Sequence, residues 1–133
     1  MIKMKTVIDA SVILARLMPD EKLAGRVDKL YQRFEKGKLD LMAPNLLVYE
    51  IANSIKSACV QKRLTRKTGQ ALLEAFLDLP IRYVGVDWLL AWNLSMKFGL
   101  SFYDAVYLSL ANELGVELIT LDKKLMRVYN KLC

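Results

Sequence analysis

The fold is decided by residues 6–17, which read TVIDASVILARL. Residues 6–8 form a short, apolar and mostly β-branched run, which favours a buried strand. Residues 12–17 then repeat apolar side chains at helical spacing, and Asp9 stands at the junction. A buried strand that leads directly into a helix is the first half of a βαβ unit, so this stretch predicts an α/β fold.

The rest of the chain repeats this alternation. We expect further strands at residues 39–43, 81–86 and 116–121, and helices at 20–37, 44–63, 65–77, 88–98, 101–114 and from 122 onward. Such an order predicts right-handed βαβ units and a mainly parallel sheet with helices on both faces, in three α/β/α layers. A length of 133 residues suits one core, so a single domain over residues 1–133 is expected.

The chain contains no histidine. Histidine is the side chain whose ordinary pKa lies nearest neutrality, so Ser-His-Asp hydrolysis, histidine-based RNA cleavage without a metal and histidine-ligated zinc are all excluded. A hydrolase of this composition needs another way to activate water near neutral pH. A divalent cation held by carboxylates is the obvious one.

Charge and hydropathy set broader limits. The 20 basic and 14 acidic residues give a net charge of +6, which fits a nucleic-acid partner and a solvated basic surface equally well. Apolar residues make up 54% of the chain, so part of the surplus is expected in a subunit interface. No run approaches the roughly 20 apolar residues of a membrane span, and no secretory signal precedes the first strand, so a soluble, cytoplasmic protein is expected. Cys59 and Cys133 lack metal-ligand spacing.

Three acidic residues are lone charges in apolar surroundings. Asp9, Glu50 and Asp104 each stand alone in a run of seven or more uncharged residues. Burying an ionised carboxylate without a partner costs several kcal/mol, so something positive is expected near each. Asn53 follows Glu50 by one helical turn and shares its helix face. Asp122, like Asp9, follows an expected strand, at the sheet edge where ligands bind in parallel α/β proteins.

Helix capping is the alternative explanation for several of these residues. Asp9, Asp104 and Asp122 each lie near an expected helix N-terminus, where an acid caps amides or complements the helix dipole. Ser11 and Ser101 are ordinary capping residues too. The functional interpretation rests on the set, because four clustered carboxylates would raise one another's pKa unless a cation neutralised them. Oxygen ligands alone favour Mg²⁺ or Mn²⁺.

Aromatic and basic residues have structural explanations as well. The aromatic residues at helical spacings are explained better by core packing than by base stacking: Trp88, Trp92, Tyr103 and Tyr107. A basic cluster lies where two expected helices meet: Lys56, Lys62, Arg63, Arg66 and Lys67. It is either a solvated face, which is slightly favoured, or a surface that contacts phosphates.

Four short motifs together resemble a known family. The motifs are Ile8-Asp9-Ala10-Ser11-Val12, Tyr49-Glu50-Ile51-Ala52-Asn53, Leu100-Ser101-Phe102-Tyr103-Asp104-Ala105 and Ile119-Thr120-Leu121-Asp122. Their order and spacing are similar to the four motifs of PIN domains across essentially the whole chain. Each motif alone is weak, and the four together are specific. Single-domain VapC toxins are the most similar subgroup.

The resemblance implies an activity and roles for residues. It implies a PIN-like α/β/α fold, a homodimer or dimer of dimers, neutralisation by a small VapB-type antitoxin, and Mg²⁺- or Mn²⁺-dependent cleavage of single-stranded RNA that leaves 5′-phosphate and 3′-hydroxyl ends. Asp9, Glu50 and Asp104 would be the principal metal ligands, and Asp122 would complete or support the site. Ser11, Asn53, Ser101 and Thr120 would support these ligands from close range.

Other functions remain open alternatives. Receiver domains and haloacid-dehalogenase-type phosphatases also place an aspartate after the first strand, but receivers have adjacent acids there and the phosphatases a second aspartate two residues on, where this chain has Ser11. The six glycines never form the G-x-G-x-x-G loop of dinucleotide-binding folds. The alternative outside enzymology is a catalytically silent PIN-like module that binds RNA or a protein partner.

Overall fold

The computed structural model describes residues 3–19 and 25–132. Its centre is a sheet of four parallel strands in the order β3-β2-β1-β4. The strands are β1 (Met4–Ile8), β2 (Leu39–Ala43), β3 (Arg82–Tyr83) and β4 (Glu117–Ile119). The expected α/β class with a parallel sheet is therefore confirmed, and the sheet is parallel throughout its described strands.

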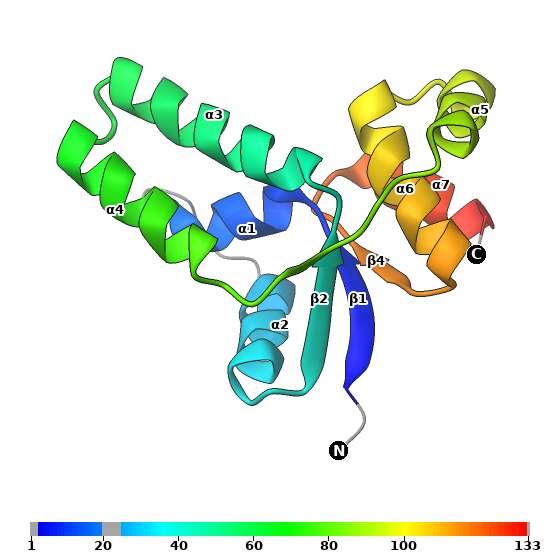
Figure 1. The fold of residues 1–133 in the computed structure, drawn as a ribbon, viewed down its shortest axis with the longest axis horizontal. Helices are drawn as coiled ribbons and strands as arrows, with labels where there is room; N and C mark the ends of the chain where they lie inside the picture. The colour runs from blue at the N-terminus through cyan, green and yellow to red at the C-terminus, as the bar shows by residue number, and fades with distance from the viewer. Residues whose placement is uncertain (1–2, 20–24, 133) are drawn as a thin grey trace.

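Helices cover both sides of this sheet. On one side lie α1 (Ala10–Leu17), α2 (Gly25–Glu35), α3 (Leu46–Val60) and α4 (Arg66–Leu77). On the other lie α5 (Trp88–Phe98), α6 (Phe102–Leu114) and α7 (Lys123–Leu132), as Figure 1 shows. In the described part of the chain, no helix is long and apolar enough to cross a membrane.

Local signals place most helix ends where the sequence predicts them. Thr65 and Asp87 cap α4 and α5 by accepting hydrogen bonds from the backbone N–H groups of Thr68 and Leu90. Gly99 and Gly115 end α5 and α6 in the left-handed conformation, which glycine adopts without steric cost. The expected opening of a helix at Asp20 lies outside the described residues.

Two strands and one helix are shorter than expected. The strand expected at 81–86 is reduced to β3, whose exposed residues pair with β2 only at Met42 and Ala43. The strand expected at 116–121 ends at Ile119, because the backbone N–H groups that follow turn to side-chain acceptors. The helix expected at 44–63 begins at Leu46 and ends at Val60, with Pro44 before it rather than in its first turn.

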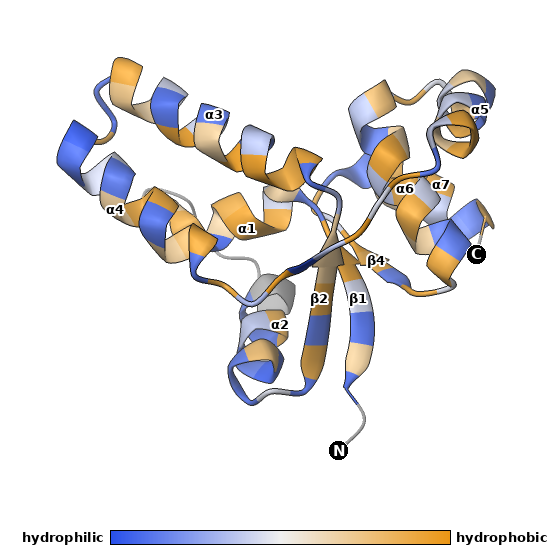
Figure 2. Ribbon diagram, in the orientation of Figure 1, coloured by the Kyte–Doolittle hydropathy of each residue, from blue (hydrophilic) through white to orange (hydrophobic). Residues whose placement is uncertain are grey.

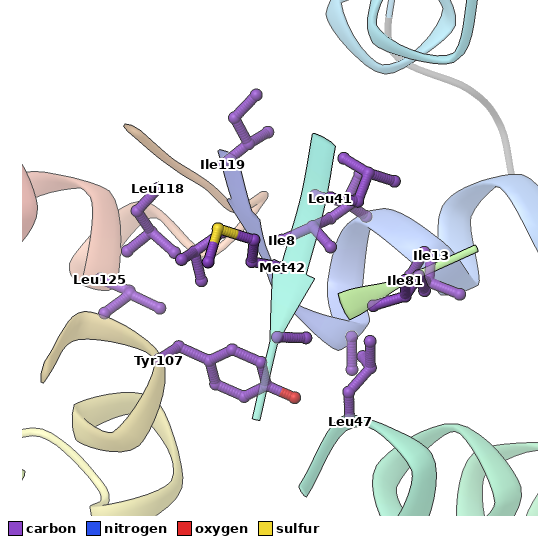
Figure 3. Packing of buried hydrophobic residues seen from close by; sticks show 14 of the residues in the cluster. Ile8, Ile13, Leu41, Met42, Leu47, Ile81, Tyr107, Leu118, Ile119 and Leu125 are labelled. Atoms are coloured by element: carbon purple, nitrogen blue, oxygen red, sulfur yellow. The ribbon is translucent and has the colours of Figure 1, made fainter. Parts of the chain in front are cut away.

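The core lies between the sheet and both helix layers. Its fully buried members come from every strand except β3, and Figure 3 shows several of them around Met42 and Tyr107. Core packing was the expected role of four aromatic residues, and it is correct only for Tyr107. Trp88 and Trp92 are exposed by 66% and 55%, because α5 lies at the outer margin of its layer and only part of its surface packs on α6. Tyr103, in the first turn of α6, is exposed by 60%.

Candidate active site

Strand order reverses between β1 and β4, and the candidate site lies at their carboxyl ends. The chain passes from β1 to β2 on one side and later returns to β4 on the other. Asp9 directly follows β1, and Thr120 directly follows β4. The backbone N–H of Asp9 also donates to the carbonyl of Ile119 at 3.4 Å, which joins the two strand ends. Such a switch point is where open α/β sheets bind ligands.

Asp9 is buried and surrounded by donors. Asp9 is only 5% exposed, and its carboxylate accepts hydrogen bonds from the hydroxyl of Ser11 at 2.6 Å and from the hydroxyl of Thr120. Those hydroxyls in turn accept the backbone N–H groups of Leu121 at 2.9 Å and Asp122 at 3.0 Å. Asp9 is therefore tied through two hydroxyls to the loop between β4 and α7, which places Ser11 and Thr120 next to it as expected.

The capping explanation for Asp9 holds only in part. The backbone N–H of Val12 does donate to Asp9 Oδ1, but at 3.4 Å, longer than either hydroxyl contact. Burial raises the pKa of the Asp9 carboxyl, and the hydrogen bonds from Ser11 and Thr120 oppose that rise. A cap on the surface needs no such enclosure, so capping alone leaves the burial of Asp9 unexplained.

Glu50 approaches from α3 and is held by a residue that sequence reasoning assigned only to the core. The hydroxyl of Tyr107, on α6, donates to Glu50 Oε1 at 2.6 Å. Tyr107 is 2% exposed, and Figure 3 shows its oxygen pointing toward the side where Leu47 of α3 lies. Burial raises the pKa of Glu50, the Tyr107 hydrogen bond lowers it, and the charges of Asp9 and Asp104 raise it further. The sequence held one signal for a role of Tyr107 in the site, because Tyr107 lies one helical turn after Asp104 and shares its helix face.

Asp104 lies in the first turn of α6, which Ser101 caps through a 3.1 Å hydrogen bond from the Asp104 backbone N–H. Burial raises the pKa of the Asp104 carboxyl, and the charge of Asp122 raises it further. Ser101 and Lys124 lower it. Lys124 also donates to the carbonyl of Gly99 at 2.6 Å, so this lysine is the nearby positive charge that a lone aspartate was expected to have.

Asp122 differs from the other three acids. It is exposed, and its Oδ1 accepts the backbone N–H of Leu125 at 2.9 Å, as a helix cap does. Capping therefore accounts for much of its position, although its charge reaches Asp104. Asn53 is exposed and lines a groove between α1 and α3 instead of bonding to Glu50.

The basic cluster expected as a surface feature lies away from the acids. All five of its side chains are exposed: Lys56 on α3, Lys62 and Arg63 in the turn after it, and Arg66 and Lys67 at the start of α4. Figure 2 shows the turn between α3 and α4 as a hydrophilic tip at the far end of this helical hairpin. The tip begins ten residues after Glu50 (50 to 60), about 15 Å along the helix.

The acids are neighbours without forming a finished metal site. The pKa shifts show that Asp9, Glu50, Asp104 and Asp122 are linked by charge repulsion. Among residues 3–19 and 25–132, however, no three acidic or cysteine side chains already have the arrangement of a metal site. The donors fit a hard divalent cation, because carboxylate and hydroxyl oxygens are what such ions bind.

Comparisons with known proteins identify the family of this chain. The PIN domain model matches residues 6–131. Ribonuclease VapC3 of Pyrobaculum aerophilum is 32% identical over 126 residues, 92% of each chain. Ribonuclease VapC9 of Mycobacterium tuberculosis is 30% identical over 119 residues, 90% of this chain and 87% of that protein. The chain belongs to the PIN domain family, among its VapC-type ribonucleases.

Solved structures show the same fold. The crystal structure of PAE2754 from Pyrobaculum aerophilum superposes with a TM-score of 0.75 at 21% identity, over 94% of this chain and 84% of that one. Mycobacterium tuberculosis VapC20, described as a Sarcin-Ricin loop cleaving toxin, gives a TM-score of 0.63 at 15% identity, over 92% of this chain and 93% of that one. At these identities the likeness concerns the fold, and it agrees with the predicted PIN-like architecture.

Proposed function

We propose that residues 1–133 act as one metal-dependent endoribonuclease domain that cuts single-stranded RNA and serves as the toxin of a VapBC-type pair. One observation supports this proposal: for each of Asp9, Glu50 and Asp104, burial and the charge of a neighbouring acid raise the pKa of the carboxyl. A divalent cation removes that repulsion. The relatives named VapC ribonucleases support the substrate class.

The residues have distinct roles in this proposal. Asp9, Glu50 and Asp104 hold Mg²⁺ or Mn²⁺, and Asp122 supports them from the rim. The bound cation supplies the activated water and the positive charge that in-line cleavage of a phosphodiester needs, with 5′-phosphate and 3′-hydroxyl products. Ser11 and Thr120 keep the Asp9 carboxylate in place through their hydroxyl donors.

Tyr107 and Ser101 position the other two ligands. The Tyr107 hydroxyl keeps one oxygen of Glu50 directed at α6, which leaves the second oxygen available for the cation. Ser101 fixes the first turn of α6 and therefore the direction of Asp104. A metal site whose ligand residues are oriented in this way usually binds the metal more weakly when the orienting group is removed.

The decisive experiment measures cleavage of a mixed pool of single-stranded RNA with Mg²⁺, with Mn²⁺ and with EDTA. Cleavage that requires a divalent cation, and that leaves 5′-phosphate ends, is the expected result. RNA binding without cleavage under all three conditions would instead identify a catalytically silent RNA-binding module.

A homodimer is part of the same proposal, and α5 is the surface that favours it. The exposed apolar side chains Leu89, Trp92 and Met96 follow Trp88 along α5. Residues 45–79, which include α3 and α4, expose large apolar side chains only at scattered positions. Contiguous apolar patches mark interfaces, and stable ones bury more than roughly 1,200 Å². Light scattering at micromolar concentration should give a dimeric mass, and Trp92→Glu should give a monomer.

The antitoxin proposal rests on the relatives' VapC names. A VapB-type antitoxin is expected to copurify with the chain when both are expressed together, and to suppress cleavage in the RNA assay. Undiminished cleavage in the presence of the bound antitoxin would contradict this part of the proposal.

A further inference from the structure

A second group of basic residues lies beside the acids, on α7 rather than on the α3–α4 hairpin. An open groove next to the site is lined by Thr120, Leu121, Asp122, Lys123, Met126 and Arg127. One end of the groove is the loop between β4 and α7, which is linked to Asp9 through the hydroxyls of Ser11 and Thr120. The groove is therefore continuous with the proposed catalytic centre.

Local helix energetics do not explain the charges along this groove. Lys123 and Arg127 are four residues apart, so they share one helix face, where like charges repel. Lys123 also stands in the first turn, where a cation opposes the helix dipole, and the helix has no acid in its first turn. Within the described part of the chain, neither side chain makes a hydrogen bond or an ion pair.

Lys124, the residue next to Lys123, has partners within the chain. It donates to the carbonyl of Gly99 at 2.6 Å and lowers the pKa of Asp104. Lys123 and Arg127 have no comparable role inside the chain. Cations placed against local preference beside an active site indicate that an anion from outside is their partner.

We propose that Lys123 and Arg127 form a binding site for backbone phosphates of the RNA strand next to the bond that is cut. The proposal rests on the proposed ribonuclease function, because that function places a polyanion across the acids. A strand that crosses Asp9 and Asp104 and continues over Thr120 enters the groove of α7 directly. Lys56 lies about 9 Å along α3 from Glu50, and the other four residues of the hairpin cluster lie beyond the end of α3, which is about 15 Å from Glu50. The hairpin tip therefore contacts only a more distant part of the strand.

Three double variants, each with two charges fewer, test this. Lys123→Gln with Arg127→Gln removes both positive charges of the α7 site. Arg66→Gln with Lys67→Gln removes two positive charges at the hairpin tip. Lys36→Gln with Lys38→Gln changes the net charge at the turn between α2 and β2, at the opposite end of the sheet. Binding of a fluorescein-labelled 12-nucleotide RNA of mixed sequence is measured by anisotropy in EDTA, and kcat and KM in Mg²⁺, each over a series of salt concentrations.

The α7 variant should weaken RNA binding on the order of 10-fold at low salt and reduce the slope of log affinity against log salt by about 1.4, which is 0.7 for each of two phosphate contacts. Its KM should rise while kcat stays near that of the unmodified protein. Its thermal midpoint should stay the same or rise slightly, because the variant removes two charges that repel each other on α7. The other two variants should change binding less than 2-fold. Equal losses in all three variants, or a loss at the hairpin tip alone, would overturn the assignment.

Binding and cleavage separate the two proposals. If the unmodified protein binds RNA but does not cut it, and the α7 variant still loses binding selectively, the phosphate site stands and the nuclease function fails. If the unmodified protein cuts RNA and the α7 variant binds and cuts it normally, the nuclease function stands and the phosphate site is wrong.

Discussion

Asp9 and Asp122 occupy similar places in the chain and very different places in the molecule. Each follows a parallel strand and precedes a helix. Asp9 is 5% exposed, accepts two hydroxyl hydrogen bonds and has a raised pKa caused by burial. Asp122 is exposed and caps its helix. A position directly after a strand therefore makes an aspartate a candidate for the active site. Whether it is held there or only caps a helix depends on the partners that other elements bring to it.

The largest expected effect separates these two aspartates directly. Asp9→Asn should lower Mg²⁺-dependent RNA cleavage at least about 100-fold, because the cation contributes several kcal/mol to the transition state and needs the carboxylate charge. Asp122→Asn should lower it less than about 10-fold. Both rates are measured on the same RNA, with circular dichroism to check folding. Equal losses in the two variants would show that the exposed aspartate is also a direct ligand.

A second, smaller effect tests how the buried side of the site is supported. Tyr107→Phe removes the hydroxyl that holds Glu50, so Mn²⁺ affinity measured by calorimetry should fall about 10-fold. Tyr129→Phe is the matched control, since the Tyr129 hydroxyl makes only a 3.5 Å contact with the carbonyl of Val116. Unchanged Mn²⁺ affinity in Tyr107→Phe would mean that the hydrogen bond has no part in metal binding.

The pH dependence of stability tests the raised pKa values of Asp9, Glu50 and Asp104. Asp9, Glu50 and Asp104 have pKa values raised from 3.8, 4.5 and 3.8, so the folded protein holds protons that the unfolded chain releases. Their contribution to stability is complete below those values and is lost as pH rises through the folded pKa values.

This loss is measurable as a falling thermal midpoint in EDTA as pH increases from about 4. The triple variant Asp9→Asn, Glu50→Gln and Asp104→Asn should lack this component, and adding Mn²⁺ should reduce it in the unmodified protein. A triple variant with the same pH profile as the unmodified protein would contradict the assignment.

The smallest expected effect concerns the cap of α7. Asp122→Ala should lower the free energy of unfolding by about 1 kcal/mol, whereas Asp122→Asn should leave it nearly unchanged, because asparagine caps as well as aspartate. Chemical denaturation of both variants measures this. A loss of stability in Asp122→Asn would show that the charge itself matters to the fold.

Much of the fold was predictable because its signals are local. The bounds of β2 and α5 were predicted without error, since a short apolar run, the Asp87 cap and the Gly99 terminator act within a few residues. The lengths of β3 and β4 were not, because the extent of a strand depends on its neighbour in the sheet. The candidate acids were likewise found from lone charges, while the exposure of Trp88 and Trp92 was not foreseen, because an apolar helix face can meet a core or remain open.

The sequence by itself determined the alternation of strands and helices and the absence of histidine chemistry, and it supplied the acidic residues that are candidates for the site. Only the tertiary structure decided which of these acids are enclosed, that Tyr107 bonds to Glu50, and that the basic residues beside the site belong to α7 rather than to the α3–α4 hairpin. The reason is physical: capping and periodicity depend on residues a few positions apart, whereas burial, charge repulsion and hydrogen bonding join residues separated by 57 or 111 positions along the chain.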